Sequence, residues 1–349
     1  MDRLPPKLVR RLVIAPFALL LCVFLVAISP VLLLAAAIAD LFLPGNWRTL
    51  RLATFLLCYL AFEVAGLLAM FVLWVASGFG ATLRSERMQN AHYGFMRWWL
   101  SSINAVAKKV FHMRVMIEDR PEPRAGPILV FCRHAGPGNS MLLIGTIMVG
   151  YRRHPRIVML AKLQWEPLYD VMLNRTPNRF IRHDPARREL YTNAITGLAT
   201  RLGDADAFVL FPEGKDFTPR VRMRAIEFLK SKGLRAAAER AEKMEHVLPP
   251  RHGGVMAAMA GAPDADVVLV AHSVLEDVGN FKELWSRIPF ERPVVARYWR
   301  VAPAEVPREQ DDVIEWLYGW WERIDRWIAD RERTSAPPAA SDPSATTAS

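Results

Sequence analysis

The sequence predicts an α/β protein in which a helical hairpin, spanning or embedded in a membrane, precedes one globular domain. Two observations predict this class. Residues 1–83 contain two long stretches almost without charge, each long enough to cross a hydrocarbon core of about 30 Å. The rest of the chain contains short β-type runs separated by helical stretches, the pattern of an α/β layer structure. We therefore expect a membrane-anchoring hairpin (1–83), an α/β domain (84–333) and a disordered tail (334–349).

Charge supports this division of the 349 residues. Residues 1–83 hold six Lys or Arg and three Asp or Glu, whereas the other 266 positions hold 39 and 32, as is ordinary for a soluble domain. This composition excludes a disordered chain, a collagen and a disulfide scaffold. A multi-span transporter is excluded because no later stretch is apolar for about 18 residues. The three cysteines and the histidines do not have zinc-binding spacing, so we expect no metal.

The hairpin comes from two apolar stretches joined by a short polar break. Leu12–Ala39 carries no charge, and Leu52–Leu83 carries only Glu63. We expect Pro16 and Pro30 to kink the first helix without ending it, because the backbone in lipid must stay internally bonded. Glu63 has two interpretations: a functional acid within the membrane, or a side chain that faces the partner helix.

Basic residues on both outer flanks of the hairpin predict its orientation. Arg10 and Arg11 precede the first helix, and Arg84 and Arg87 follow the second. By the positive-inside rule, both flanks and the globular domain lie on the cytoplasmic face of the cell membrane. The alternative is a cleaved signal peptide, because Ala-Ile-Ala before Asp40 resembles a cleavage site.

The globular part begins with an amphipathic helix predicted over residues 84–113. A second helix is predicted over residues 311–333, either covering the core or presenting an interfacial aromatic belt. β-Type runs lie between the two helices, and the strands expected from them are 114–119, 127–132, 156–160, 207–211, 266–272 and 296–301.

The candidate catalytic and binding residues follow the ends of two predicted strands. The first strand ends at Cys132 and is followed by His134, a Gly-Pro-Gly turn and Asn139. A histidine at such an edge can act as a general base near neutral pH, although a lone histidine can also be a surface or core residue. Asn139 or Ser140 is expected to cap the helix that follows.

The second strand ends at Phe211 and is followed by Glu213 and Gly214. Cations come close behind in the sequence, at Lys215, Arg220, Arg222 and Arg224. A carboxylate among cations beside a tight turn suits a substrate that bears a phosphate or several hydroxyls. The alternative is a turn acid in a solvated basic stretch.

Together, and 79 positions apart, these motifs resemble the glycerol-phosphate acyltransferase superfamily, specifically the membrane-anchored bacterial 1-acylglycerol-3-phosphate (lysophosphatidate) acyltransferases. That family carries H-x-x-x-x-D followed by F-P-E-G, which here read as His134 to Asn139 and Phe211 to Gly214. The stretch Asn-Arg-Phe-Ile-Arg-His-Asp, with Arg179 and Arg182, resembles the block that holds the substrate phosphate. An apolar block at 266–272 and Leu-Pro-Pro-Arg at 248–251 extend the resemblance, which covers roughly residues 110–275.

The resemblance implies a glycerolipid-acyltransferase-like domain with a mixed sheet flanked by helices. It implies transfer of a fatty acyl group from acyl-CoA or acyl carrier protein to the free hydroxyl of lysophosphatidate or a similar lysolipid. His134 would remove the hydroxyl proton, and the residue at position 139 would hold the imidazole. The implied substrate-binding residues are Arg179, Arg182, Glu213, Gly214, Lys215 and Arg220. No cofactor is expected, since a thioester is already activated.

The chain departs from the family pattern at two places. Asn139 stands where the family has aspartate, so the charge that would stabilise an imidazolium is missing there. Lys215 and Asp216 stand where a small hydroxyl residue and an arginine are usual; Asp216 would partly replace the lost carboxylate if its loop folds back. Cys132 is either a nucleophile that forms an acyl intermediate or a small buried strand residue.

These departures leave two functions open. The chain is either an active acyltransferase or a catalytically impaired relative that binds lipid or acyl-CoA as a membrane scaffold. Nucleic-acid binding is excluded although the net charge is +10, because no basic motif interleaved with aromatic residues occurs and anionic lipid explains the charge more simply. The expected partners are therefore membrane lipid, a lysophosphatidate-like acceptor and an acyl donor; the sequence does not indicate an oligomeric state.

Overall fold

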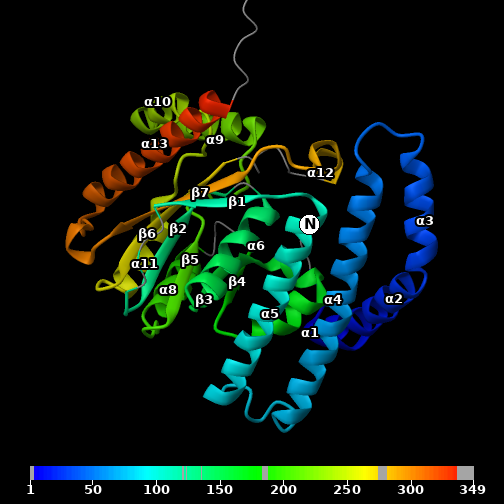
Figure 1. Ribbon diagram of the computed structural model, residues 1–349. Coiled ribbons are helices and arrows are strands. Elements are labelled where there is room, and N and C mark those ends of the chain that lie inside the picture. Colours follow the sequence, from blue (N-terminus) through cyan, green and yellow to red (C-terminus); the bar gives the residue numbers. More distant parts are fainter. Residues whose placement is uncertain are drawn as a thin grey trace, which may run out of the picture.

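The computed structural model describes residues 4–119, 122, 124–134, 136–182, 188–273 and 281–335, and it confirms the predicted fold class (Figure 1). Apolar helices at the N-terminus precede a mixed sheet that has helices on both faces. The predicted boundary at residue 83 lies in the turn before α5, and most of the predicted tail lies outside the described residues. The N-terminal helices are α1 (Lys7–Val9), the π-helical η1 (Arg10–Ile14), α2 (Ala15–Ala27), α3 (Ser29–Asp40) and α4 (Arg48–Ala76).

Strands and helices then alternate along the chain. The strands are β1 (Val115–Glu118), β2 (Ile128–Cys132), β3 (His154–Leu160), β4 (Arg179–Ile181), β5 (Asp206–Leu210), β6 (Asp266–His272) and β7 (Val294–Val301). The helices are α5 (Glu86–Val110), α6 (Pro137–Gly145), η2 (Thr146–Gly150), η3 (Ala161–Trp165), α7 (Pro167–Arg175), α8 (Arg188–Ala199), α9 (Pro219–Ser231), α10 (Arg235–Lys243), α11 (His252–Gly261), α12 (Phe281–Arg287), η5 (Pro303–Glu305) and α13 (Gln310–Ser335).

The sheet has the strand order β1-β7-β6-β2-β5-β3-β4, and only the β6–β7 pair is antiparallel. Every residue of the central strand β2 is buried, because one face of the sheet packs against α4–α7 and the other against α8–α11 and α13. All six predicted strands are present. The short edge strand β4 was not predicted as a strand, because three residues carry no readable period.

The first arm of the hairpin is broken, which differs from the kinked but continuous helix that the sequence predicts. α2 ends at Ala27, and Ile28 leaves the helical conformation before α3 begins at Ser29. Pro30 explains the break, since its ring lacks an N–H and restricts the preceding residues. Lys7–Ala27 and Arg48–Ala76 are each long and apolar enough to cross a membrane.

The second arm, α4, packs along α5. Three aromatic pairs follow the two helices: Phe55 with Phe111, Tyr59 with Trp99, and Phe62 with Trp98, at centroid distances of 4.7, 6.1 and 5.9 Å. Burial of these rings fastens the hairpin to the globular domain.

Polar contacts join the hairpin to the start and end of α7. Arg10 Nη2 lies 2.8 Å from Asp170 Oδ1, and Arg175 Nη1 donates to the Met70 carbonyl at 2.6 Å. Glu63 is buried and accepts a hydrogen bond from the Leu168 amide at 3.1 Å. The hydrogen bond of Glu63 is thus made to α7 of the globular domain, a partner that neither interpretation included.

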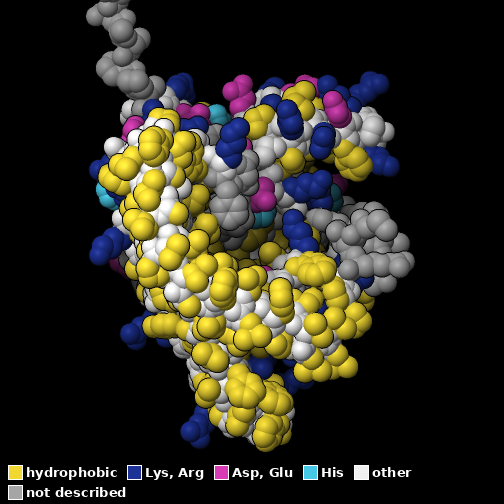
Figure 2. All heavy atoms as spheres, turned by 90° about the vertical axis from the view of Figure 1, so that its right-hand side faces the viewer, with side chains coloured by type: hydrophobic (Ala, Val, Ile, Leu, Met, Phe, Trp, Pro, Cys, Tyr) yellow, Lys and Arg dark blue, Asp and Glu magenta, His cyan; other side chains and the backbone are white. Residues whose placement is uncertain are grey.

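Hydrophobic side chains cover the outer face of the hairpin. Figure 2 shows a broad hydrophobic surface with Lys and Arg side chains along its edges. Exposed side chains of α2–α4 contribute to this surface, among them Phe17, Leu20, Phe24, Val31, Leu34, Phe71 and Val72. An exposed apolar area of this extent marks a membrane or protein contact, and its basic edges suit anionic lipid.

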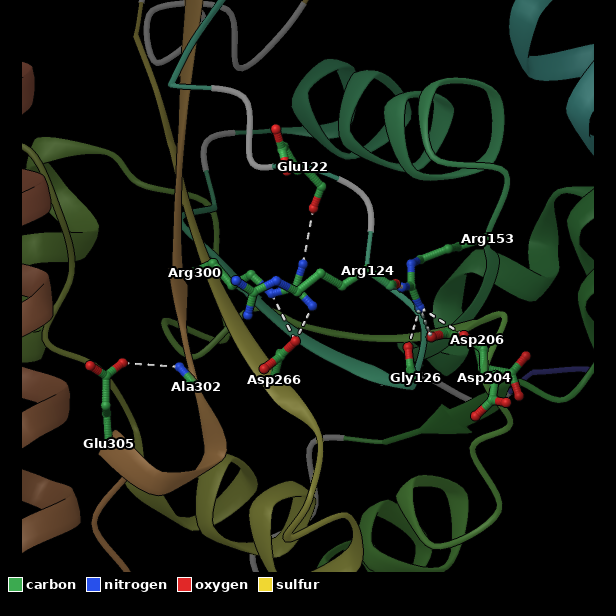
Figure 3. Close-up of polar contacts among 10 residues, drawn as sticks. All are labelled: Glu122, Arg124, Gly126, Arg153, Asp204, Asp206, Asp266, Arg300, Ala302 and Glu305. Atoms are coloured by element: carbon green, nitrogen blue, oxygen red, sulfur yellow. Dashed lines mark hydrogen bonds and ion pairs between the residues drawn. The ribbon is translucent and has the colours of Figure 1, made fainter.

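Arg153 fastens the edge of the sheet that lies opposite the carboxyl ends of β2 and β5 (Figure 3). Its buried guanidinium donates to the carbonyls of Arg124, Gly126, Asp204 and Asp206 at 2.5–3.2 Å. The charge is thus spread over backbone acceptors of two segments, the one before β2 and the one at the start of β5, and the group has a structural role.

Replacing Arg153 with alanine is expected to lower the free energy of unfolding by about 3 kcal/mol, because several buried carbonyls lose their donor at once. Urea unfolding of the purified chain in detergent measures this loss. Arg152→Ala is the matched control, since Arg152 is the exposed neighbour and its loss should change stability by less than about 0.5 kcal/mol. Equal stability of the two variants would contradict the structural role of Arg153.

Candidate active site

The candidate site lies where the carboxyl ends of β2 and β5 meet. The two strands are parallel, and Phe131 is paired with Leu210. His134 follows β2 by two residues and Glu213 follows β5 by three, so both motifs lie on the same edge of the sheet. This is the edge at which open α/β sheets bind ligands.

Glu213 joins the loops around the site. Its Oε1 accepts from the His134 amide at 3.3 Å and from Trp321 Nε1 at 3.4 Å, and its Oε2 accepts from the Leu248 amide at 3.1 Å. Burial raises the pKa of this carboxyl to about 7, although the charge of Arg133 and the hydrogen bonds oppose the rise. The carboxylate oxygens are therefore engaged within the protein, in contacts that position the His134 loop.

The main chain of His134 is held on both sides. Its N–H donates to Glu213, and its carbonyl accepts from the Phe217 amide at 2.8 Å. The neighbouring Arg133 is fully buried and donates to the carbonyls of His246 and His272 at 2.5–3.1 Å. The backbone at His134 is thereby fixed by contacts that do not involve the imidazole.

A tight turn at Gly214 returns the chain toward His134. Gly214 has φ +68°, a left-handed conformation that glycine adopts without strain. The turn places Asp216 Oδ1 3.3 Å from Nε2 of His134 and 2.9 Å from the Gly136 amide nitrogen. The loop after β5 thus folds back onto the loop after β2.

The imidazole of His134 is suited to be a base. It stacks on Phe211 with ring centroids 4.4 Å apart, and 23% of its side chain is exposed. Burial lowers its pKa, the Asp216 carboxylate opposes this, and the charge of Lys162 lowers it further. Because the net direction is downward from an ordinary value near 6.5, the ring is mostly neutral at pH 7. Its Nε2 faces Asp216, and its Nδ1 is buried without a described hydrogen-bond partner.

Asn139 lies in the first turn of α6 and is buried, with 4% of its surface exposed. The predicted capping role of Asn139 or Ser140 is wrong, because the helix begins earlier, at Pro137, with Gly136 at the N-cap position. Gly136 has φ +104°, a conformation that favours glycine.

The predicted cations lie at or near the same edge without a described contact to His134. Arg179 begins β4, and Arg182 follows its last residue, so Arg182 lies at the carboxyl edge. Lys215 follows the Gly214 turn, and Arg220 lies in the first turn of α9. All four side chains are exposed, and their substrate-binding role stays a prediction.

Two residues of the site were missed from the sequence. Lys162 lies just beyond the carboxyl end of β3, the strand next to β5, and its charge acts on His134. A survey of cations that directly follow predicted strands would have found it. Trp321 comes from α13, more than 100 positions from Glu213, and nothing in the sequence indicates that contact.

Cys132 lies in the core on the α4–α7 face of the sheet, and burial raises the pKa of its thiol. A buried thiol of this kind is not a nucleophile, so the interpretation of Cys132 as a small buried strand residue fits the structure. Within the described part of the chain, no cluster of three or more His, Cys, Asp or Glu side chains could hold a metal ion.

Comparisons with known proteins find a similarity at the level of structure. No protein-family model and no curated protein sequence matches the chain. The chain is similar in structure to the 1-acyl-sn-glycerophosphate (LPA) acyltransferase PlsC from Thermotoga maritima, at 13% sequence identity and a TM-score of 0.43. The match covers 77% of this chain and 97% of PlsC.

Proposed function

We propose that this chain is a membrane-associated acyltransferase that moves a fatty acyl group from a thioester to the free hydroxyl of 1-acylglycerol-3-phosphate or a similar lysolipid. The observation that carries the proposal is the partly exposed imidazole of His134 at the carboxyl edge of the sheet, with its main chain held by Glu213 and Phe217. The H-x-x-x-x-N and F-P-E-G motifs, far apart in sequence, build this one constellation.

The proposed reaction needs one base and no covalent enzyme intermediate. The imidazole of His134 accepts the proton of the acceptor hydroxyl as the oxygen attacks the thioester carbonyl carbon. The tetrahedral intermediate collapses, the carbon–sulfur bond breaks, and the leaving thiolate takes the proton from the imidazolium. An oxygen ester and a free thiol result, and the imidazole is regenerated. Positioning and general-base catalysis suffice for an activated thioester.

Charge and surface support a lipid acceptor with a phosphate. Lys162, Arg182, Lys215 and Arg220 follow strand ends or loops at the site edge, and such cations bind phosphate oxygens. Figure 2 shows a hollow above the hydrophobic surface, with acidic and histidine side chains in it and Lys and Arg side chains beside it. A lysolipid in a bilayer would present its headgroup to this hollow while its acyl chain stays in lipid.

We further propose that the hairpin attaches the enzyme to the cell membrane, with the globular domain on the cytoplasmic face, where acyl-CoA and acyl carrier protein are available as donors. The basic residues that flank the apolar helices support this orientation.

The second candidate function is a membrane scaffold that binds lipid or acyl-CoA without transferring acyl groups. One observation favours it: a neutral amide, Asn139, is buried in the helix that follows the His134 loop, where the family pattern has a carboxylate. The two functions differ in turnover, which an assay measures directly.

The assay supplies the purified full chain in detergent with acyl-CoA or acyl carrier protein thioester and a panel of acceptors. We expect lysophosphatidate to be acylated and the corresponding monoacylglycerol, which lacks the phosphate, to be acylated at least about tenfold more slowly. Binding of acyl-CoA without turnover toward any acceptor would support the scaffold instead.

The pH dependence of transfer follows from the lowered pKa of His134. The base is active when neutral, so the rate should rise with pH through the imidazole pKa and level off above it. Because burial and Lys162 lower this pKa, the rising part should lie below pH 6.5, the value for a free histidine. Initial rates between pH 4.5 and 8.5 measure the profile; a rising part centred above pH 7 would contradict this environment of His134.

A further inference from the structure

We propose that Asp216 is the positioning residue for His134 and supplies, from the loop after β5, the negative charge that Asn139 lacks. The proposal rests on the proposed acyltransferase function for its catalytic meaning. The contact between Asp216 and His134 belongs to this chain's own loop geometry and can be tested without that function.

The geometry brings the carboxylate to the imidazole. Oδ1 of Asp216 lies 3.3 Å from Nε2 of His134, close enough to form an ion pair when the ring is protonated. The same oxygen accepts from the Gly136 amide at 2.9 Å. Asp216 thus bridges the imidazole and the turn that follows it, and the main chain restricts its position.

Two charges from different segments act on the imidazole of His134 in opposite directions. Lys162 approaches from η3 and disfavours the imidazolium, whereas Asp216 approaches from the loop after β5 and favours it. The described hydrogen bond between Glu213 and His134 involves the main-chain N–H of His134 and not its imidazole. Asp216 is therefore the acidic group that faces the ring in the described structure.

We expect Asp216 to stabilise the imidazolium only moderately. Its side chain is half exposed, with 51% of its surface accessible, and solvent screens an exposed pair. As the acceptor hydroxyl loses its proton, the imidazole becomes an imidazolium, and a fixed carboxylate beside it lowers the energy of that state. The effect should appear in kcat and leave KM nearly unchanged, since the charge forms only during the reaction.

The turn at Gly214 is what makes this arrangement possible. The chain reverses there at φ +68°, and Phe217 is fixed three residues later by its hydrogen bond to the His134 carbonyl. Asp216 lies between these two fixed points, so it cannot move far from the imidazole while both hold.

Asp216→Asn separates charge from structure. Asparagine keeps an oxygen that can accept from the Gly136 amide but removes the negative charge. We expect kcat to fall about tenfold with KM unchanged, and the pKa of His134 to fall, which extends the pH profile to lower pH. Asp264→Asn, at an exposed acid before β6 on the opposite edge, is the matched control.

A second readout does not depend on acyl transfer. Carbethoxylation of His134 by diethyl pyrocarbonate, followed by mass spectrometry as a function of pH, reports the pKa of the imidazole in the full chain. A lower pKa in Asp216→Asn than in wild type and Asp264→Asn supports the pairing even if wild type transfers no acyl group, in which case only the proposed function fails. An unchanged pKa in Asp216→Asn overturns the proposal, as does an Asp216→Asn variant whose kcat and pH profile match those of wild type.

Discussion

Replacing His134 with alanine is expected to lower the rate of acyl transfer by about 10³-fold, because the reaction loses its only proposed base. The substitution should leave the site otherwise intact. The contacts of this residue to Glu213 and Phe217 use its main-chain N–H and carbonyl, which alanine retains. We therefore expect acyl-CoA binding to change by less than about threefold while turnover is lost.

Initial rates with labelled acyl-CoA and lysophosphatidate, and equilibrium binding of acyl-CoA in the same detergent, measure the two effects separately. His112→Ala provides the matched control, since His112 is an exposed histidine before β1. Retention of more than about a tenth of wild-type turnover in His134→Ala would show that another group accepts the proton.

Replacing Glu213 with alanine is expected to have the largest effect on stability at the site. Three donors lose their acceptor together: the amides of His134 and Leu248 and the indole of Trp321. Each buried, unsatisfied donor costs about 1–3 kcal/mol, and the resulting cavity admits water that recovers part of this cost. We expect a net loss of about 4 kcal/mol and at least about 100-fold lower turnover, because the His134 loop is no longer fixed.

Thermal unfolding followed by circular dichroism measures this loss, and Glu227→Ala on the exposed face of α9 is the control. A melting temperature within about 2 °C of wild type would contradict the buried hydrogen-bonding role of Glu213.

Glu213 also predicts a pH dependence of stability. Its folded pKa of about 7 lies above the ordinary value of 4.5, so the folded state holds the proton more tightly than the unfolded state. Stability from this group is complete below about pH 4.5 and is lost as pH rises through 7. Glu213→Gln cannot titrate. The unfolding free energy of wild type minus that of this variant should therefore fall from pH 5 to pH 8. A difference that grows over that range would contradict the raised pKa.

The sequence was sufficient for the fold class because its signals are long or strongly periodic. The two apolar stretches, the six longer strands and the helices at 84–113 and 311–333 are all present in the structure. β4 was not predicted as a strand, since Arg179–Ile181 is too short to show alternation. The break at Ile28 was missed because proline in an apolar helix is compatible with either a kink or an end.

The site was predictable only as two separate motifs. His134 and Glu213 follow recognisable strand ends, and parallel strands bring such ends to one edge. The burial of Glu213 and its contact with Trp321 depend on how α13 packs against the sheet, which local sequence does not encode. The sequence predicted the approach of Asp216 to His134 only on the condition that the loop folds back. That fold requires the reversal at Gly214 and the hydrogen bond that fixes Phe217.

The most direct test of the account is to follow the acyl group itself. Purified wild-type chain and His134→Ala are each incubated with acyl-CoA and lysophosphatidate, and mass spectrometry counts the acylated product and the free thiol. The account predicts that wild type forms one acylated lipid for each thiol released and that His134→Ala stays near the rate without protein. Equal product from both proteins, or thiol release by wild type without an acylated lipid, would contradict the proposed transfer.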